Sequence, residues 1–190
     1  RLGRAMALSL ASAGFSVAVH YRSGEEAALS LKAEIEALGQ GCCLFQADLA
    51  EEEQVVGLVE KAAAHLGGPV GVLVNNASTF ERDEWNTVTR AGWDAHLEPN
   101  LRAPYVLMQD FARLLPAGRE GMGLNMLDER VWSLTPHFVS YTVSKSALWT
   151  LTRTMARARA PRKIRVNAIG PGPALPSARQ TEEQFRQQCS

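Results

Sequence analysis

Short apolar runs alternate with longer amphipathic segments along the first 75 residues. The short runs, rich in β-branched residues, predict strands, whereas segments with apolar residues on one side and charges on the other predict helices. The expected helices are 5–13, which is closed by Gly14, then 24–38 and 51–66, and the expected strands are 15–20, 42–46 and 70–74. This alternation with short connections is typical of βαβ units and a parallel sheet.

The same pattern continues after a charged loop at 79–89. We expect a helix over 91–115, bent near Pro99 and Pro104 because proline lacks the amide hydrogen that a helix needs. Strands are expected at 123–127 and 164–169, with a helix between them that ends near residue 159. The predicted fold class is α/β, a Rossmann-type doubly wound parallel sheet. No repeat, linker or low-complexity segment interrupts it, so we expect a single domain over 1–190.

Composition excludes several classes of partner. Lysine plus arginine and aspartate plus glutamate are 20 each, so the net charge is zero and gives no reason to expect a nucleic-acid or membrane partner. Three cysteines do not form a disulfide framework, and a reducing cytoplasm is the simpler setting. The sequence shows no apolar run of membrane-spanning length and no signal-peptide pattern, and we expect no metal site.

The candidate chemistry centres on Tyr141 and Lys145, which lie one helical turn apart on the same face. An ammonium there is expected to lower the pKa of a nearby phenol and so to make it a proton donor to a carbonyl or imine. Alone the pair is weak evidence, because a solvated helical pair has the same spacing.

Polar residues follow the strand 70–74 where open parallel sheets bind ligands, outside the carboxyl ends of the strands. The segment Asn75-Asn76-Ala77-Ser78 stands there, although Asn and Ser also favour ordinary turns. Asn100 follows in the next helix, and Asp128 ends the strand 123–127.

Taken in this order, with Tyr141, Lys145 and Pro171-Gly172 after them, these motifs resemble the short-chain dehydrogenase/reductase family over essentially the whole chain. Within it the chain looks most like the pteridine reductases and their bacterial relatives. Asp128 stands thirteen positions before Tyr141, where most of the family carries a catalytic serine. Arg1-Leu2-Gly3 matches one form of the glycine-rich turn, and the segment 20–23 matches the one by which such enzymes select NADPH.

The residues independently favour NADPH. An acidic residue after the second strand would bind the ribose hydroxyl of NAD, whereas this corner offers Arg22 and Ser23, which can bind a 2′-phosphate. A surface arginine after a strand is the alternative. The resemblance implies a cofactor site of the following residues: Arg1, Leu2, His20, Tyr21, Arg22, Ser23, Asp48, Leu49, Asn75, Ala77, Ser78, Lys145, Pro171 and Gly172.

The resemblance also assigns catalytic roles. Tyr141 would supply the proton, Lys145 would bind the nicotinamide ribose, and Asn100 would support a water chain. Asp128 would assist proton delivery to a ring nitrogen.

For the substrate, the resemblance implies Ser78, Asp128 and Tyr141, with Phe80 stacking a pterin ring against the nicotinamide. An aromatic folded onto the core is nearly as good an explanation of Phe80. Trp132 and His137 lie between Asp128 and Tyr141 and are candidates to shape the substrate pocket, but core packing is the expectation for both. By resemblance, helices around Asn100 and Tyr141 would join subunits into a homotetramer.

Two expected parts of the family fold have no counterpart in the sequence. No strand and Thr-Gly-x-x-x turn precede Arg1, and no strand follows the segment 175–190, which resembles the start of a substrate-covering segment. We therefore expect a sheet without its first and last strands.

Three functions remain open at this stage: NADPH-dependent pterin or dihydropteridine reduction, reduction of a ketone, quinone or acyl carbonyl, and a catalytically silent binding protein. The presence of the tyrosine, lysine and asparagine together argues against the third.

Overall fold

The computed structural model describes residues 2–172, 183 and 186. The predictions for Arg1 and for the segment 175–190, except 183 and 186, lie outside the described residues. In chain order the helices and strands are as follows: α1 (Leu2–Ser12), β1 (Val17–Tyr21), α2 (Glu25–Ala37), β2 (Cys42–Gln46), α3 (Glu52–Val55), α4 (Leu58–Leu66), β3 (Val72–Asn75), α5 (Arg90–Leu97), η1 (Glu98–Arg102), α6 (Ala103–Leu114), β4 (Gly121–Met126), η2 (Glu129–Val131), α7 (Val139–Arg159), η3 (Ala160–Arg162) and β5 (Ile164–Ile169).

All strand pairs are parallel, which confirms the predicted α/β fold class. β1 pairs with β2, and β3, β4 and β5 form a second group with β4 in its centre. Within the described residues β1 and β3 do not pair, so the strands form two groups instead of one continuous sheet.

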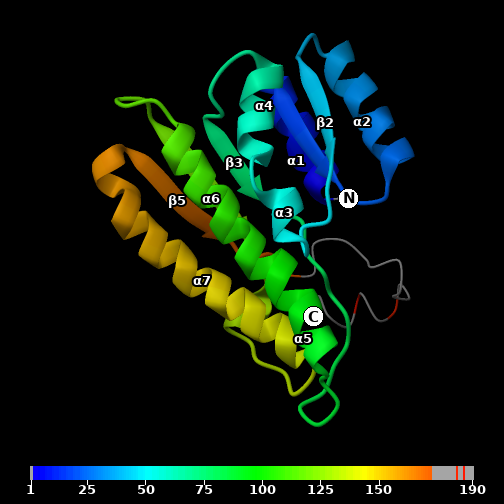
Figure 1. Ribbon diagram of the computed structural model, residues 1–190. Coiled ribbons are helices and arrows are strands. Elements are labelled where there is room, and N and C mark those ends of the chain that lie inside the picture. The colour runs from blue at the N-terminus through cyan, green and yellow to red at the C-terminus, as the bar shows by residue number, and fades with distance from the viewer. Residues whose placement is uncertain (1, 173–182, 184–185, 187–190) are drawn as a thin grey trace.

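Helices cover both faces of the strands, as a doubly wound fold requires. On one face α1 and α2 enclose a small core with alternate residues of β1, Val17 and Val19. On the opposite face Phe45 of β2 meets the His65 ring of α4 edge-on, at 5.3 Å between centroids. Figure 1 shows α4 in front of the strands and α1 behind them.

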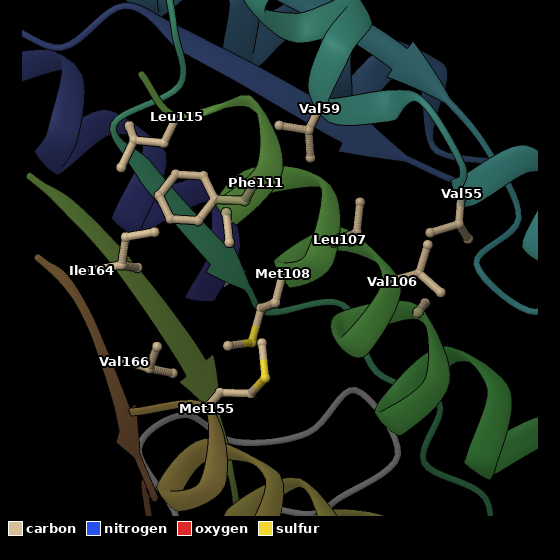
Figure 2. Packing of buried hydrophobic residues seen from close by; sticks show 12 residues of the cluster. Val55, Val59, Val106, Leu107, Met108, Phe111, Leu115, Met155, Ile164 and Val166 are labelled. Carbon is tan, nitrogen blue, oxygen red and sulfur yellow. The ribbon is translucent and has the colours of Figure 1, made fainter. Parts of the chain in front are cut away.

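The larger core lies between β5 and the helices α4, α6 and α7. Phe111 and Met108 of α6 are both 2% exposed, and Figure 2 shows Met108 and Met155 of α7 pointing toward one another. This packing fixes α7, and hence Tyr141 and Lys145, against the carboxyl ends of β4 and β5.

Two helices differ from the sequence expectation at residues that interrupt helical hydrogen bonding. The expected helix 51–66 is broken into α3 and α4 at Gly57, whose φ of 80° lies in the left-handed region. The expected helix 91–115 is divided into α5 and α6 by a turn of π-helix, η1, which contains Pro99 and Asn100. Such bulges form where a helical hydrogen bond is missing, and they are frequent at functional sites.

Candidate active site

Tyr141 and Lys145 lie in the first half of α7, beside the ends of β4 and β5. Both side chains are buried, at 6% and 2% exposure. Lys145 Nζ donates a hydrogen bond to the carbonyl oxygen of Met126, the last residue of β4, at 2.8 Å. The same nitrogen lies 5.8 Å from the centre of the Tyr141 ring. The strand end therefore holds the ammonium beside the phenol.

The expected lowering of the phenol pKa is wrong for this arrangement. Burial raises the pKa of Tyr141 above its usual value, and the negative charge of Asp128 raises it further, while Arg130 and the Ser78 hydroxyl lower it. Burial also lowers the pKa of Lys145 to about 8, against the opposing charge of Asp128. The phenol is therefore held protonated, and Lys145 is the weaker base of the two.

Asp128 is brought to the phenol, as predicted. Tyr141 Oη donates a hydrogen bond to Asp128 Oδ2 at 3.0 Å. The other carboxylate oxygen accepts the backbone N–H of Arg130 at 2.9 Å and lies 3.4 Å from its guanidinium. Asp128 caps η2 through this backbone bond. A phenol, a carboxylate and two cations thus meet at the carboxyl end of β4.

An aromatic wall stands next to the phenol. The Phe80 ring stacks on Phe138 at 4.5 Å and presents its edge toward Tyr141 at 4.6 Å. The Arg130 guanidinium lies 5.4 Å from the Phe80 ring and 5.0 Å from that of Phe138. Phe80 is 43% exposed, so it faces the site and is not folded into the core.

Asn100 fastens the loop that follows β3. Its side-chain oxygen accepts the N–H of Thr79 at 2.8 Å, and its nitrogen donates to the Thr79 carbonyl and to Ser144 Oγ. The side chain is 1% exposed. Its amide is therefore committed to the loop and to α7, and the expected water chain stays a prediction.

A cleft of about 620 Å³ opens beside this cluster, at the carboxyl ends of β1, β2 and β3. It collects most of the residues expected to bind a cofactor: His20, Tyr21, Arg22, Ser23, Asp48, Leu49, Ala77 and Ser78, with Phe80 also on its wall. His20 Nε2 lies 2.8 Å from the carbonyl of Ala47, and Asp48 Oδ1 accepts the N–H of Ala50. Arg22 is exposed, and none of the described acidic side chains pairs with it.

The start of α1 closely approaches the loop after β3. A Cβ added at Gly3 would lie 2.7 Å from Asn76 Nδ2, so glycine allows the two segments to meet. Leu2 lies in the same first turn of α1.

Several predicted cofactor residues lie outside the cleft wall, among them Asn75, Pro171 and Gly172. Asn75 is buried and donates to Asn125 Oδ1 at 2.8 Å, whereas its neighbour Asn76 lines the cleft. Pro171 and Gly172 pack on η2, where the Pro171 carbonyl accepts the N–H of Glu129. Trp132, expected in the core, is 61% exposed and covers Gly170. His137, given the same expectation, instead bonds Glu84 through Nδ1.

Sequence reasoning missed Arg130, Phe138 and Asn76. Arg130 follows Asp128 by two positions, and the cap at Asp128 that turns it toward the phenol leaves no clear sequence signal. Phe138 adopts a left-handed conformation with φ of 58°, which sequence rarely reveals for a residue other than glycine. Asn76 had a signal, because it lies within the quoted Asn-Asn-Ala-Ser segment.

The fold and the site together define a doubly wound α/β protein with a tyrosine and lysine pair at the carboxyl edge of its sheet. The short chain dehydrogenase family matches residues 2–187. The chain belongs to this family of oxidoreductases.

Several relatives are similar over most of the chain. FolM alternative dihydrofolate reductase 1 from Brucella canis, crystallised with NADP, is 45% identical, with 99% of this chain and 74% of that chain covered and a TM-score of 0.93. The corresponding Brucella suis protein, also with NADP, is 46% identical over the same shares, with the same TM-score. The 3-oxoacyl-acyl-carrier-protein reductase FabG of Staphylococcus epidermidis is 30% identical, with 90% of this chain and 70% of the relative covered.

In the part of the chain that the structure describes, none of the helices has the length and apolar character needed to cross a membrane.

Proposed function

We propose that this protein is an NADPH-dependent reductase of a pterin or dihydropteridine, with Tyr141 as the proton donor. The observation that carries the proposal is the hydrogen bond from Tyr141 Oη to Asp128 Oδ2, next to the exposed Phe80 ring. A carboxylate at this position suits proton delivery to a ring nitrogen, and an aromatic ring suits a flat heterocycle. The similarity to the two FolM alternative dihydrofolate reductases supports the same substrate class.

The cleft fits NADPH. Its volume lies within the range of cofactor sites, roughly 300–1,000 Å³. The exposed Arg22 and Ser23 on its wall suit a 2′-phosphate. NADPH, when bound, would supply the hydride.

Side chains of the protein then supply the proton to the substrate. Because the phenol of Tyr141 stays protonated, it holds the hydrogen that the substrate nitrogen needs. Release of that proton leaves a phenolate, which the positive charge of Arg130 and the hydrogen bond from the Ser78 hydroxyl stabilise. Asp128, once it has taken up a proton from solvent, returns it across the 3.0 Å contact to the phenolate.

The test is NADPH oxidation by the full-length protein with dihydropterins, folates and simple carbonyls side by side, and NADH in parallel. We expect turnover of a pterin with NADPH that falls by about 10³-fold or more in Tyr141→Phe, since the proton donor is lost. Asp128→Ser should lower pterin turnover by about 10²-fold. Turnover of carbonyls but of no pterin would refute the assignment of a pterin substrate. A preference for NADH would refute the assignment of NADPH as the cofactor.

Carbonyl reduction is the second candidate, favoured by the 30% identity to FabG, a 3-oxoacyl reductase. Under this alternative Asp128→Ser, which restores the residue that most of the family carries, retains or increases carbonyl turnover. Comparing the parent protein with Asp128→Ser on pterins and on carbonyls therefore distinguishes the two functions. A homotetramer in the cytoplasm completes the proposal.

A further inference from the structure

The loop that carries Phe80 is fastened at every second residue. The backbone of Thr79 bonds to the Asn100 side chain in both directions, the N–H of Glu81 donates to His96 Nε2 at 3.0 Å, and the carbonyl of Asp83 accepts the N–H of Phe138 at 2.8 Å. The three attachments come from η1, α5 and the start of α7.

A buried chain of side chains joins two of these attachments. His96 is 2% exposed, and because its Nε2 accepts a backbone N–H, the ring proton must reside on Nδ1. That nitrogen lies 2.7 Å from Ser140 Oγ and 3.0 Å from the carbonyl of Gly92. Ser140, which is fully buried, is also hydrogen-bonded through its hydroxyl and its N–H to the Asp83 carboxylate.

The residues between the attachments point elsewhere. Phe80 lies between Thr79 and Glu81 and faces Tyr141 and Phe138. The exposed Arg82 forms an ion pair with the half-buried Glu84. The hydrogen bonds on both sides of Phe80 therefore restrain the backbone that carries the ring, and the contacts with Phe138 and Tyr141 restrain the ring itself.

We propose that Asp83, His96 and Ser140 are positioning residues that determine how tightly the site recognises a flat heteroaromatic substrate, by holding Phe80 in place. This rests on the proposed function, in which Phe80 stacks the substrate. The three residues are referred to below as the loop clamp. Because Ser140 directly precedes Tyr141, the loop clamp sets the separation between the stacking ring and the proton donor.

The kinetic test uses Ser140→Ala and Asp83→Ala with a dihydropterin and NADPH. We expect the KM for the pterin to rise roughly tenfold, because misplacing a positioning group by a fraction of an ångström weakens stacking, while kcat and the KM for NADPH stay within about threefold. Asp83→Asn keeps an oxygen acceptor and should recover most of the affinity. Thr154→Ala, which removes an exposed hydroxyl on the same helix, is the matched control and should match the parent.

A double-mutant cycle tests whether the effect passes through Phe80. In a Phe80→Ala background, Ser140→Ala should add less than about twofold to KM, since there is no ring left to position. The proposal would be overturned if Ser140→Ala raised the KM for the pterin a further tenfold in the Phe80→Ala background. It would also be overturned if Ser140→Ala lowered kcat equally for pterins and carbonyls.

Amide hydrogen exchange separates failure of the loop clamp from failure of the proposed function. The N–H groups of Thr79 and Glu81 should be protected in the parent protein, and protection of Glu81 should fall at least tenfold in Ser140→Ala. An unprotected Glu81 in the parent would refute the clamp whatever the substrate. If the Glu81 N–H is protected but the protein turns over no pterin, the proposed substrate class is refuted. The role of the loop clamp in recognising a flat heteroaromatic substrate is then refuted with it.

Discussion

At the scale of single residues, the site differs most from expectation in how charge is distributed. The tyrosine and lysine spacing predicted a phenol with a lowered pKa, but burial and Asp128 raise the phenol pKa, and burial lowers that of Lys145 to about 8. The spacing places two groups on one helical face, but it carries no information on how deeply that face is buried or on the carboxylate that β4 brings to it. Arg130 is the second cation of the site, and its guanidinium lies near both aromatic rings, those of Phe80 and Phe138.

The buried ammonium of Lys145 should make stability depend on pH. Below pH 8 the Lys145 amine is protonated in both the folded and the unfolded chain, so the folded protein bears the full cost of burying the charge. From pH 8 to 10.5 only the unfolded chain keeps this proton, so the free energy of unfolding rises with pH. Lys145→Met should therefore raise the free energy of unfolding by about 2 kcal/mol at pH 7. This figure already allows for the cost of the hydrogen bond that the Met126 carbonyl loses in the variant. Denaturant unfolding measured from pH 7 to 10 checks this.

The advantage of the variant should shrink steadily above pH 8. Cys42 and Cys43, whose pKa values are raised by burial, are common to both proteins and cancel in the difference. A stability difference that does not change with pH would mean that Lys145 does not lose its proton in this range.

At the scale of elements, the sequence predicted a helix or strand correctly where the spacing of apolar residues stayed the same along the whole segment. The strand 42–46 and the helix containing Tyr141 were predicted closely, because a short apolar run and helical spacing are local signals. The break at Gly57 was missed because a glycine in a helical pattern does not by itself reveal its φ. At the site, Asp128 and Phe80 were found through family spacing, whereas the hydrogen bonds of His96 and Ser140 depend on tertiary contacts that no local pattern encodes.

A buried polar chain fastens α7 to the sheet, and it offers a prediction at this scale. Asn75 donates to Asn125, whose side chain in turn donates to Thr152 Oγ1 of α7 at 2.8 Å. Thr152→Val keeps the shape but removes the acceptor, so a buried amide loses its partner at a cost of about 1–3 kcal/mol. Thermal unfolding should then occur a few degrees lower, roughly 3–9 °C.

The matched control is Thr154→Val, two residues along the same helix. Its hydroxyl is exposed and bonds only its own helix, so we expect a change within about 0.5 kcal/mol. Equal effects of the two substitutions would show that helix propensity, and not the buried chain, accounts for the loss.

At the scale of the whole molecule, the described strands form two groups, and the site lies along the carboxyl ends of both. The cofactor cleft belongs to β1, β2 and the loop after β3, while the proton-donating cluster belongs to β4 and α7. The two are joined by the loop 76–81, which lines the cleft and carries Phe80 to Tyr141. This arrangement explains why the position of that loop matters for the substrate that is proposed to stack on Phe80.

The proposed homotetramer can be tested through stability. The net charge is zero, so there is no long-range repulsion to oppose association, and apolar side chains such as Val143 of α7 remain 39% exposed. If folded subunits associate, mass action should raise the midpoint of thermal unfolding by about 2–4 °C for each tenfold increase in concentration. Light scattering on the same samples gives the mass.

Two substitutions decide which surface is responsible for that dependence. Val143→Glu places a charge on the helix expected to join subunits and should abolish the concentration dependence, because burying an unpaired carboxylate opposes association. Leu29→Glu, an equally conspicuous apolar residue at 54% exposure on α2, should leave it intact. A midpoint that is independent of concentration in the parent protein, together with the mass of one chain, would show a monomer, and the exposed side chains of α7 would then require another explanation.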